Sequence, residues 1–299
     1  MRFRRSITVL SVVIVALSAF AAVMGVLASG VFSAESLPHF THTSVRGQEV
    51  QIWGFGVYRH MSVELAPQGI AQDVVTLTIG LPLLLGSLVF ARRGSLRARL
   101  LLTGTLGYFM VTYVFYLVMG TFNELFLVYV VLAGAAFYAF TLAMMSFDAV
   151  VVADALRERA PRRFVGIFLI LNSVAIALMW LGVVAPYAMT SETPPEVEHF
   201  TTLIVQGLDL SILLPASFLA GLLLLRKRAF GYLLSSVYIV FLAILMIALV
   251  GKIVGQTFVG AEVIPAIIII PAICLTAVGA AVWMLRSVEQ APVGQESGG

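Results

Sequence analysis

The sequence predicts an all-α protein, a polytopic bundle of transmembrane helices with eight spans. Hydrophobic residues make up 61% of the 299 residues and charged residues only 11%, against about 25% in a soluble domain. The apolar residues form runs of about 20, the length at which a helix crosses a bilayer. The basic residues stand in short turns between these runs, which argues for the lipid bilayer as a partner and against nucleic acid.

The expected spans fill most of the chain, which we treat as one membrane domain. The first apolar run is longer than the 7–15 residues of a signal peptide's apolar core, so it indicates an uncleaved span. The tail at 287–299 has no apolar periodicity and is predicted to be disordered. The spans are expected at 7–27, 70–91, 100–119, about 125–147, 164–188, 203–225, 230–250 and 264–285.

Residues 29–70 form the longest stretch between spans and are expected to lie outside the cell. Glu49 and Gln51 alternate with apolar neighbours, a pattern typical of a half-buried strand, and Gly47 supplies a turn before them. These features predict a small β-hairpin that caps the helices. A segment that lies in the membrane interface through Trp53 is the alternative.

The distribution of Lys and Arg predicts the orientation of the spans. With the N-terminus inside, 15 of the 18 basic residues fall in inner segments, and only Arg46, Arg59 and Lys252 fall outside. Short cytoplasmic segments of membrane proteins are rich in Lys and Arg. The sequence therefore predicts a multi-pass plasma-membrane protein with both termini in the cytoplasm.

Two halves of the chain resemble each other when one is shifted by 133 residues. The shift places 76–82 (TLTIGLP) on 209–215 (DLSILLP), with the same residue at four of the seven positions. Four spans return the chain to the same side of the membrane, so a repeat of this kind has parallel orientation. We therefore expect a 4+4 parallel repeat with halves at 1–147 and 164–286.

Three strings carry a resemblance to known sequences that extends over most of the chain from about Val45. They are VQGLDLSILLPASFLAGLLLLRKRAFGYLL, LVFARRGSLRARLLLTGTLGYF and NELFLVYV. With these strings the chain resembles an uncharacterised family of prokaryotic multi-span membrane proteins. That family has no assigned activity or site, so the resemblance implies only a polytopic membrane protein.

Asp209 is the leading candidate for a functional residue. It lies roughly 9–14 Å inside the sixth span, and an acid at that depth is costly and commonly functional. Gln206 and Thr202 share its helix face. We expect Asp209 to face the interior and bind a proton or cation, with Gln206 and Thr202 completing the pocket. Alternatively, it is a structural acid that is protonated or bonded to Asn172, Tyr113 or a serine.

The first half offers a related pair, because Asp73 and Thr76 overlay Gln206 and Asp209 under the shift. Charged residues also stand near the outer ends of the spans. They either line a vestibule or are ordinary interfacial charges with extended side chains. These residues are Asp73, Glu124, Lys252 and Glu262.

All four histidines fall on the outer side of the predicted topology. Two of them have His-x-x-His spacing, and a third ligand from another outer segment would suit zinc or copper. Ordinary surface histidines are the alternative, because loops place them freely. The metal-ligand candidates are His39, His42, His60 and His199. No cofactor is predicted.

The motifs of common enzymes are absent from the sequence. It contains no Gly-x-Ser-x-Gly, His-Glu-x-x-His, Cys-x-x-Cys, P-loop or Gly-x-Gly-x-x-Gly. Cys274 is the only cysteine, which excludes an intramolecular disulfide and a cysteine-based metal site. These absences count against the common hydrolases, zincins, ATPases and dehydrogenases.

Three functions remain open on the sequence alone. The favoured one is a secondary transporter or ion-coupled permease for a small solute, with a buried acid that binds a proton or cation. The second is a non-catalytic sensor or assembly partner that acts through the extracytoplasmic loop. The third is a membrane-embedded metalloenzyme, which needs the outer histidines to converge. Assembly into an oligomer is compatible with each.

Overall fold

The computed structural model describes residues 2–29, 39–190, 192–260 and 263–289. Eight helices in these ranges are long and apolar enough to cross a membrane, which confirms the predicted all-α bundle. Six of them are single helices and two are composite. The single helices are α1 (Arg4–Leu27), α4 (Leu96–Met119), α5 (Phe126–Met145), α7 (Arg162–Val184), α10 (Ala229–Thr257) and α11 (Ala266–Arg286).

The two composite helices each contain a π-helical turn. One is built from α2 (Ala66–Val75), a π turn (Thr76–Gly80) and α3 (Leu81–Arg92). The other is built from α8 (Ile204–Leu208), a π turn (Asp209–Leu213) and α9 (Leu214–Leu225). The two π turns begin 133 residues apart, and so do the helices α3 and α9 that follow them.

Each π turn is followed by a helix whose second residue is a proline, Pro82 in α3 and Pro215 in α9. Proline has no N–H, so it removes one backbone hydrogen bond, and nearby hydroxyls can bond the carbonyls of a disturbed helix. The Thr78 hydroxyl donates to the Val74 carbonyl at 2.7 Å. The Ser211 hydroxyl donates to the Gly207 carbonyl at 2.6 Å, again 133 residues further on.

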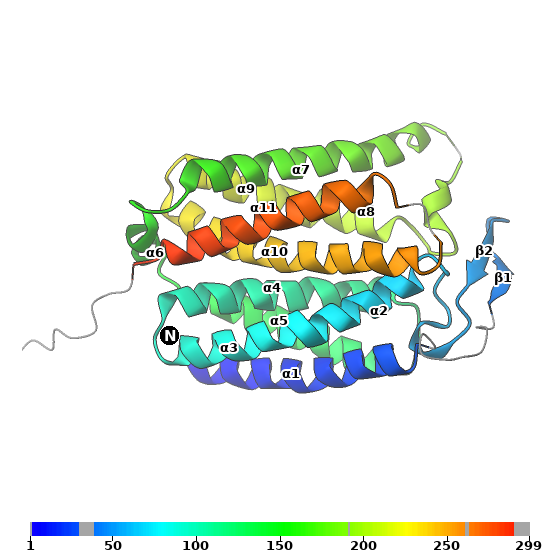
Figure 1. Ribbon diagram of the computed structural model, residues 1–299, viewed down its shortest axis with the longest axis horizontal. Coiled ribbons are helices and arrows are strands. Elements are labelled where there is room, and N and C mark those ends of the chain that lie inside the picture. The colour runs from blue at the N-terminus through cyan, green and yellow to red at the C-terminus, as the bar shows by residue number, and fades with distance from the viewer. Residues whose placement is uncertain (1, 30–38, 191, 261–262, 290–299) are drawn as a thin grey trace, which may run out of the picture.

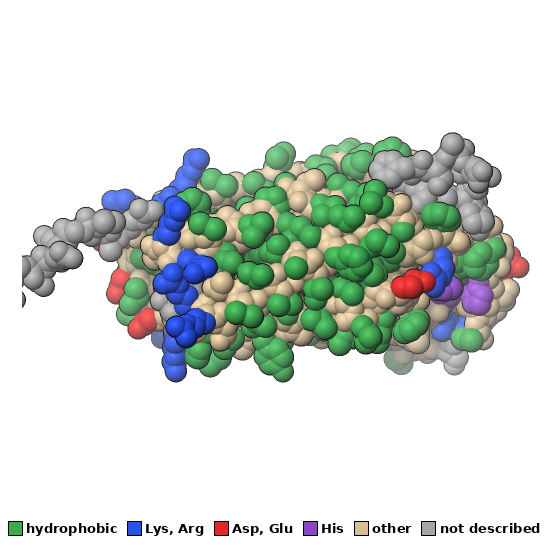
Figure 2. All heavy atoms as spheres, turned by 90° about the horizontal axis from the view of Figure 1, so that it is seen from below, with side chains coloured by type: hydrophobic (Ala, Val, Ile, Leu, Met, Phe, Trp, Pro, Cys, Tyr) green, Lys and Arg blue, Asp and Glu red, His purple; other side chains and the backbone are tan. Residues whose placement is uncertain are grey.

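The spans run along the long axis of the molecule (Figure 1). The N-terminus, the short helix α6 (Ala149–Leu156) and the end of α11 lie at one end, and the β-hairpin lies at the other. Lys and Arg side chains gather in a band at the end that carries the N-terminus, and hydrophobic side chains cover the length between the ends (Figure 2). This is the surface expected of a protein that crosses a bilayer.

The core of the bundle is centred on α4 and α10, which pack against each other. In their most apolar stretches 67% and 72% of the residues are buried, against 11% in α7. The two helices approach closely at Gly104, where an added Cβ would lie 2.5 Å from the Val240 side chain. Small residues at such crossings let helices in a membrane pack closely.

The segment we name the outer cap, residues 39–65, contains the predicted hairpin. Strands β1 (Phe40–Thr43) and β2 (Glu49–Ile52) pair antiparallel, with Phe40 opposite Ile52. Gly47 in the connecting turn has φ +80°, a conformation that glycine adopts without strain. A 3₁₀ turn (Gly56–Tyr58) follows and brings the chain back to the bundle.

Several boundaries differ from the expected ones, most of them by up to four residues. Helix α10 continues to Thr257, beyond the expected end at 250. The expected end lies where the apolar run stops before Lys252, but a lysine does not interrupt a helix. The start of the predicted tail is packed: the Glu289 N–H donates to the Ala155 carbonyl at 3.0 Å, and the Glu289 carboxylate lies 3.1 Å from Arg159. The remainder of that tail, 290–299, lies outside the described residues.

Candidate functional site

Acidic side chains lie within the membrane-spanning helices at two places. The first, which we name the tyrosine site, consists of Asp73 with Tyr58 and Tyr116. The second, which we name the Asp209 site, consists of Asp209 with Trp180 and Lys252. Each acid lies in or next to one of the two π turns.

At the tyrosine site, phenol groups bond both oxygens of a buried carboxyl group. Asp73 on α2 is only 4% exposed. Tyr58 from the outer cap donates to Asp73 Oδ2, and Tyr116 from α4 donates to Asp73 Oδ1 at 2.8 Å. The two phenol oxygens lie 3.2 Å apart, and Tyr116 Oη is also 3.1 Å from the Gly69 carbonyl oxygen. The outer cap is thereby joined to two spans through one acid.

Two glycines make room for this arrangement. A Cβ at Gly25 of α1 would lie 1.7 Å from Asp73 Oδ2, and a Cβ at Gly69 would lie 2.6 Å from the Tyr58 ring. Burial, and next the negative charge of Asp73, raise the pKa of the Tyr58 phenol well above its ordinary value. Tyr58 therefore keeps its proton and remains a hydrogen-bond donor at physiological pH.

A second group of buried polar side chains lies beside this site on the same two helices, α2 and α4, and on the first π turn. Gln72 Nε2 donates to Tyr108 Oη at 2.7 Å and to Thr112 Oγ1 at 3.3 Å. Thr76, a candidate from the sequence, has its hydroxyl 3.1 Å from Tyr108 Oη. Tyr108, Thr112 and Tyr116 are spaced by four residues, so they line one face of α4 and could have been found from that spacing.

The Asp209 site is more open. Asp209 begins the second π turn and is half-buried, and Trp180 Nε1 on α7 donates to Asp209 Oδ2 at 2.8 Å. The half-buried Lys252 of α10 attracts the carboxylate electrostatically. This site combines an acid, a base and an indole donor from three different spans.

The partners of Asp209 differ from those considered in the sequence. Asn172, also on α7, is half-buried but lies about 12 Å further from the outer end than Trp180, at 1.5 Å per residue. Tyr113 belongs to the aromatic cluster of the first half, with its ring 5.7 Å from that of Tyr116. Tyr58, Tyr116 and Trp180 are absent from the sequence candidates, since single aromatic residues are common in spans.

A pocket of about 460 Å³ opens beside α8 at the outer end of the second half. Gln206 is its buried polar residue, with 9% exposure, and Thr202 is an exposed part of its wall. Arg46 from the outer cap and Glu192 from the loop after α7 also line it. Arg46 Nη2 donates to the Glu198 and Phe200 carbonyls, which ties the hairpin turn to this pocket.

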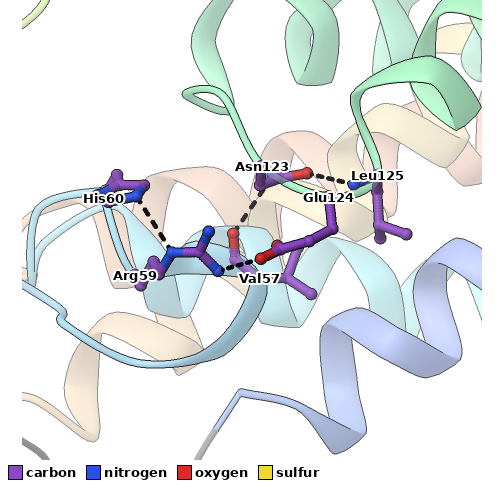
Figure 3. Close-up of polar contacts among 6 residues, drawn as sticks. All are labelled: Val57, Arg59, His60, Asn123, Glu124 and Leu125. Carbon is purple, nitrogen blue, oxygen red and sulfur yellow. Dashed lines mark hydrogen bonds and ion pairs between the residues drawn. The ribbon is translucent and has the colours of Figure 1, made fainter.

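The charges predicted near the outer ends lie in separate surroundings. Glu124 is exposed and pairs with Arg59 of the outer cap at 2.6 Å (Figure 3). A hydrogen bond from its own backbone and then one from Arg59 hold the pKa of Glu124 below its ordinary value. Asp73 and Lys252 belong to the two sites above, and Glu262 lies outside the described residues.

Three of the four histidines lie near one another without a metal-binding arrangement. The rings of His42 and His199 are 6.3 Å apart, and His199 Nε2 lies 2.9 Å from the His60 carbonyl oxygen. His60 Nε2 accepts from Arg59, and His39 Nδ1 bonds the Trp53 carbonyl. Across the described ranges, no three His, Cys, Asp or Glu residues are placed to hold a metal ion.

His199 also lies close to its neighbour Glu198, whose backbone carbonyl accepts a hydrogen bond from Arg46 of the hairpin turn. Glu198 Oε2 and His199 Nδ1 lie 3.9 Å apart, and neither atom has a hydrogen-bond partner in the part of the chain that the structure describes. Burial raises the pKa of the Glu198 carboxyl group and lowers the pKa of the His199 imidazole. Both shifts favour the uncharged forms.

Comparisons with protein-family models, curated proteins and solved structures find no match to this chain. The resemblance to a prokaryotic family therefore remains a prediction. The length and composition of the eight helices define the class of the protein as a multi-pass membrane protein.

Proposed function

We propose that the protein is a secondary transporter or ion-coupled permease in which Asp209 binds the coupling proton or cation. One observation carries this proposal: Asp209 is a half-buried acid within a span, with Trp180 as its hydrogen-bond donor and with Lys252 close enough to attract it. Ionisable groups inside membrane spans are expensive and usually serve ion or proton pathways.

The neighbouring pocket provides the solute site of this proposal. It combines an apolar wall, which includes Leu203 and Leu210, with polar groups from Arg46, Thr202 and Gln206. A pocket of about 460 Å³ has the size of a small-molecule site. Gln206 stands one helical turn before Asp209, so a solute bound at Gln206 is close to the coupling acid.

Lys252 gives the coupling a physical basis. Asp209 and Lys252 attract each other electrostatically, with no ion pair between them among the described residues, and proton binding by Asp209 removes this attraction. An anionic group of a solute can then replace the carboxylate as the counter-charge. Proton and solute binding favour each other in this scheme, which is the linkage that a symporter needs.

The 4+4 repeat and the topology belong to the same proposal. The π turns, the prolines and the hydroxyl bonds of Thr78 and Ser211 are all separated by 133 residues, which supports two related halves. The band of basic side chains at the end with the N-terminus supports a plasma-membrane orientation with that end in the cytoplasm (Figure 2).

Proton flux in proteoliposomes tests the proposal. A trapped pH dye reports flux after addition of a panel of amino acids, organic anions and sugars. We expect one of these solutes to drive proton movement in the wild type, and Asp209→Asn to abolish it because the amide does not titrate. Ser211→Ala, which changes an exposed hydroxyl on the same helix, serves as the matched control and retains flux. Full flux in Asp209→Asn, or no flux with any solute in the wild type, contradicts the proposal.

A second candidate is a non-catalytic sensor or assembly partner that acts through the outer cap. It is favoured by the hairpin, in which all four residues of β1 are exposed and Val45 in the turn is 98% exposed. A photo-crosslinking residue at Val45 in whole cells tests it. A discrete crosslinked partner supports this function, and uncrosslinked protein alone contradicts it. The third function considered from the sequence, a membrane-embedded metalloenzyme, is not supported by a cluster of metal ligands among the described residues.

A further inference from the structure

Asp73 is a buried acid that the proposed transport cycle does not use. It is 4% exposed, and it makes no ion pair with any Lys, Arg or His among the residues described. An isolated carboxylate in such surroundings is costly unless it is neutralised or fully hydrogen-bonded. Within the described ranges, its side-chain hydrogen-bond partners are two phenols, Tyr58 and Tyr116.

The elements that carry the hydrogen-bond partners of Asp73 and the nearby rings present uncharged groups to it. The outer cap contributes Tyr58 and α4 contributes Tyr116, together with Tyr108 and Tyr113 nearby. Helix α5 contributes Tyr129, whose ring lies 5.1 Å from that of Tyr116, and α1 contributes Gly25. The titratable groups beside the acid are therefore phenols, which keep their protons near neutral pH. Helix α10 also packs against α2 and carries Lys252, which is attracted to Asp209.

The hydrogen bonds can be satisfied with Asp73 ionised. In this state both phenols donate to the carboxylate, one to each oxygen, as the distances allow. The charge is then stabilised by two donors that cannot move away, because Tyr58 is fixed in the outer cap and Tyr116 in α4. Hydrogen bonds to an ionised group are stronger than those between neutral groups.

The same heavy-atom positions also suit a protonated Asp73. The proton on Oδ2 is donated to the oxygen of Tyr58, and the Tyr58 hydroxyl then donates to Tyr116 Oη, 3.2 Å away. The Tyr116 hydroxyl donates to the Gly69 carbonyl at 3.1 Å. Every donor thus has an acceptor in both states, and a change of state requires only hydroxyl rotation.

We propose that Asp73, Tyr58 and Tyr116 form a proton-binding site that takes one proton per chain and is separate from the Asp209 site. The carboxyl group holds the proton, and the two phenols reverse their hydrogen-bond direction to accommodate it. Because Tyr58 belongs to the outer cap, the protonation state also sets how strongly the cap is held on the bundle.

Infrared difference spectroscopy across a pH titration in lipid nanodiscs tests this site. A protonated carboxyl group has its own carbonyl band, and we expect one such band to titrate in the wild type and to be lost in Asp73→Asn. Asp209→Asn removes a different band and leaves this one unchanged. Tyr116→Phe keeps the acid, and we expect it to move the pH at which the Asp73 band appears, because the ionised carboxylate loses one of its two donors.

The controls separate a proton site from other outcomes. Thermal unfolding of each variant shows whether it is folded. If Asp73→Asn does not fold, the change in the carboxyl band of Tyr116→Phe serves as the test. A carboxyl spectrum that is identical in the wild type and Asp73→Asn overturns the proposal. A titration that shifts when sodium replaces choline at constant ionic strength also overturns it, because it indicates a metal-cation site.

Discussion

The tyrosine site and the Asp209 site occupy neighbouring positions of two similar composite helices, yet their surroundings differ. Asp73 lies three residues before the first π turn, and Asp209 is the first residue of the second. Asp73 is closed beneath the outer cap and bonded by phenols, whereas Asp209 is half-buried with a base and an indole beside it. The same backbone arrangement therefore holds one closed acid and one open acid.

The facing helix explains the difference. Tyr108, Thr112 and Tyr116 of α4 give the first half a polar face toward Asp73 and its neighbours. A shift of 133 residues places these positions on Phe241, Leu245 and Leu249 of α10, which have no hydrogen-bonding side chain. Asp209 therefore depends on Trp180 from α7 and on Lys252 at the outer end of α10. The half-buried Asp209 is the acid that solvent can reach, which suits the proposed role in transport.

The largest expected effect comes from closing the space around Asp73. A Cβ in Gly25→Ala would lie 1.7 Å from Asp73 Oδ2, so we expect a loss of about 3 kcal/mol or more of unfolding free energy. Gly182→Ala is the control in α7, because an added Cβ there meets nothing within 4 Å. Thermal unfolding in nanodiscs measures both. Equal unfolding temperatures for the two variants would show that Asp73 is not held in a closed site.

The next effect compares two buried phenols. Tyr116→Phe removes a donor from a buried acid, and we expect a loss of about 1–3 kcal/mol. Tyr238→Phe removes a donor to the Leu213 carbonyl at 2.8 Å, and we expect about 0.5–1.5 kcal/mol because the acceptor is neutral. Denaturant unfolding of both variants in the same detergent gives the comparison. A larger loss of unfolding free energy for Tyr238→Phe than for Tyr116→Phe would contradict the expectation that the bond to the acid is the stronger one.

A smaller effect is expected at the open acid. Trp180→Phe removes the indole donor to Asp209, and we expect a loss of about 1 kcal/mol because the half-buried carboxylate retains Lys252. The same denaturant experiment measures it. A loss above that of Tyr116→Phe would mean that Asp209 is the more enclosed of the two acids.

The smallest effect concerns pH at the loop that contains Glu198 and His199, next to the pocket beside α8. The pKa of His199 is lowered by burial, so the docked loop binds fewer protons than the undocked loop. Acidification through the ordinary range of histidine therefore favours undocking, and the contribution of neutral His199 is fully present above that range. The Glu198 carboxylate, 3.9 Å from His199 Nδ1, stabilises the protonated imidazole and so reduces this acid-induced undocking. We therefore expect Glu198→Gln to increase the undocking at low pH. Hydrogen exchange of the loop at pH 7.5 and 5.5 measures the change, and greater protection at pH 5.5 contradicts it.

The sequence predicts the spans well because apolar run length is a one-dimensional property. The hairpin of the outer cap is also predictable, because alternation around Glu49 and a turn glycine are local signals. The tyrosine site is not predictable from such signals. Tyr58 and Asp73 meet Tyr116 only because α1 leaves space at Gly25 and the outer cap folds back onto α2. Helix packing, which determines these contacts, does not follow from hydropathy.

The difference in openness between the two acids is the central claim, and carbodiimide labelling of carboxyl groups tests it most directly. The protein in nanodiscs is treated with a water-soluble carbodiimide and an amine, and modified residues are identified by mass spectrometry. We expect Asp209 to be modified and Asp73 to be protected, with Tyr58→Phe increasing the modification of Asp73 because the outer cap loses a hydrogen bond to it. Equal modification of Asp73 and Asp209 in the wild type would contradict the account.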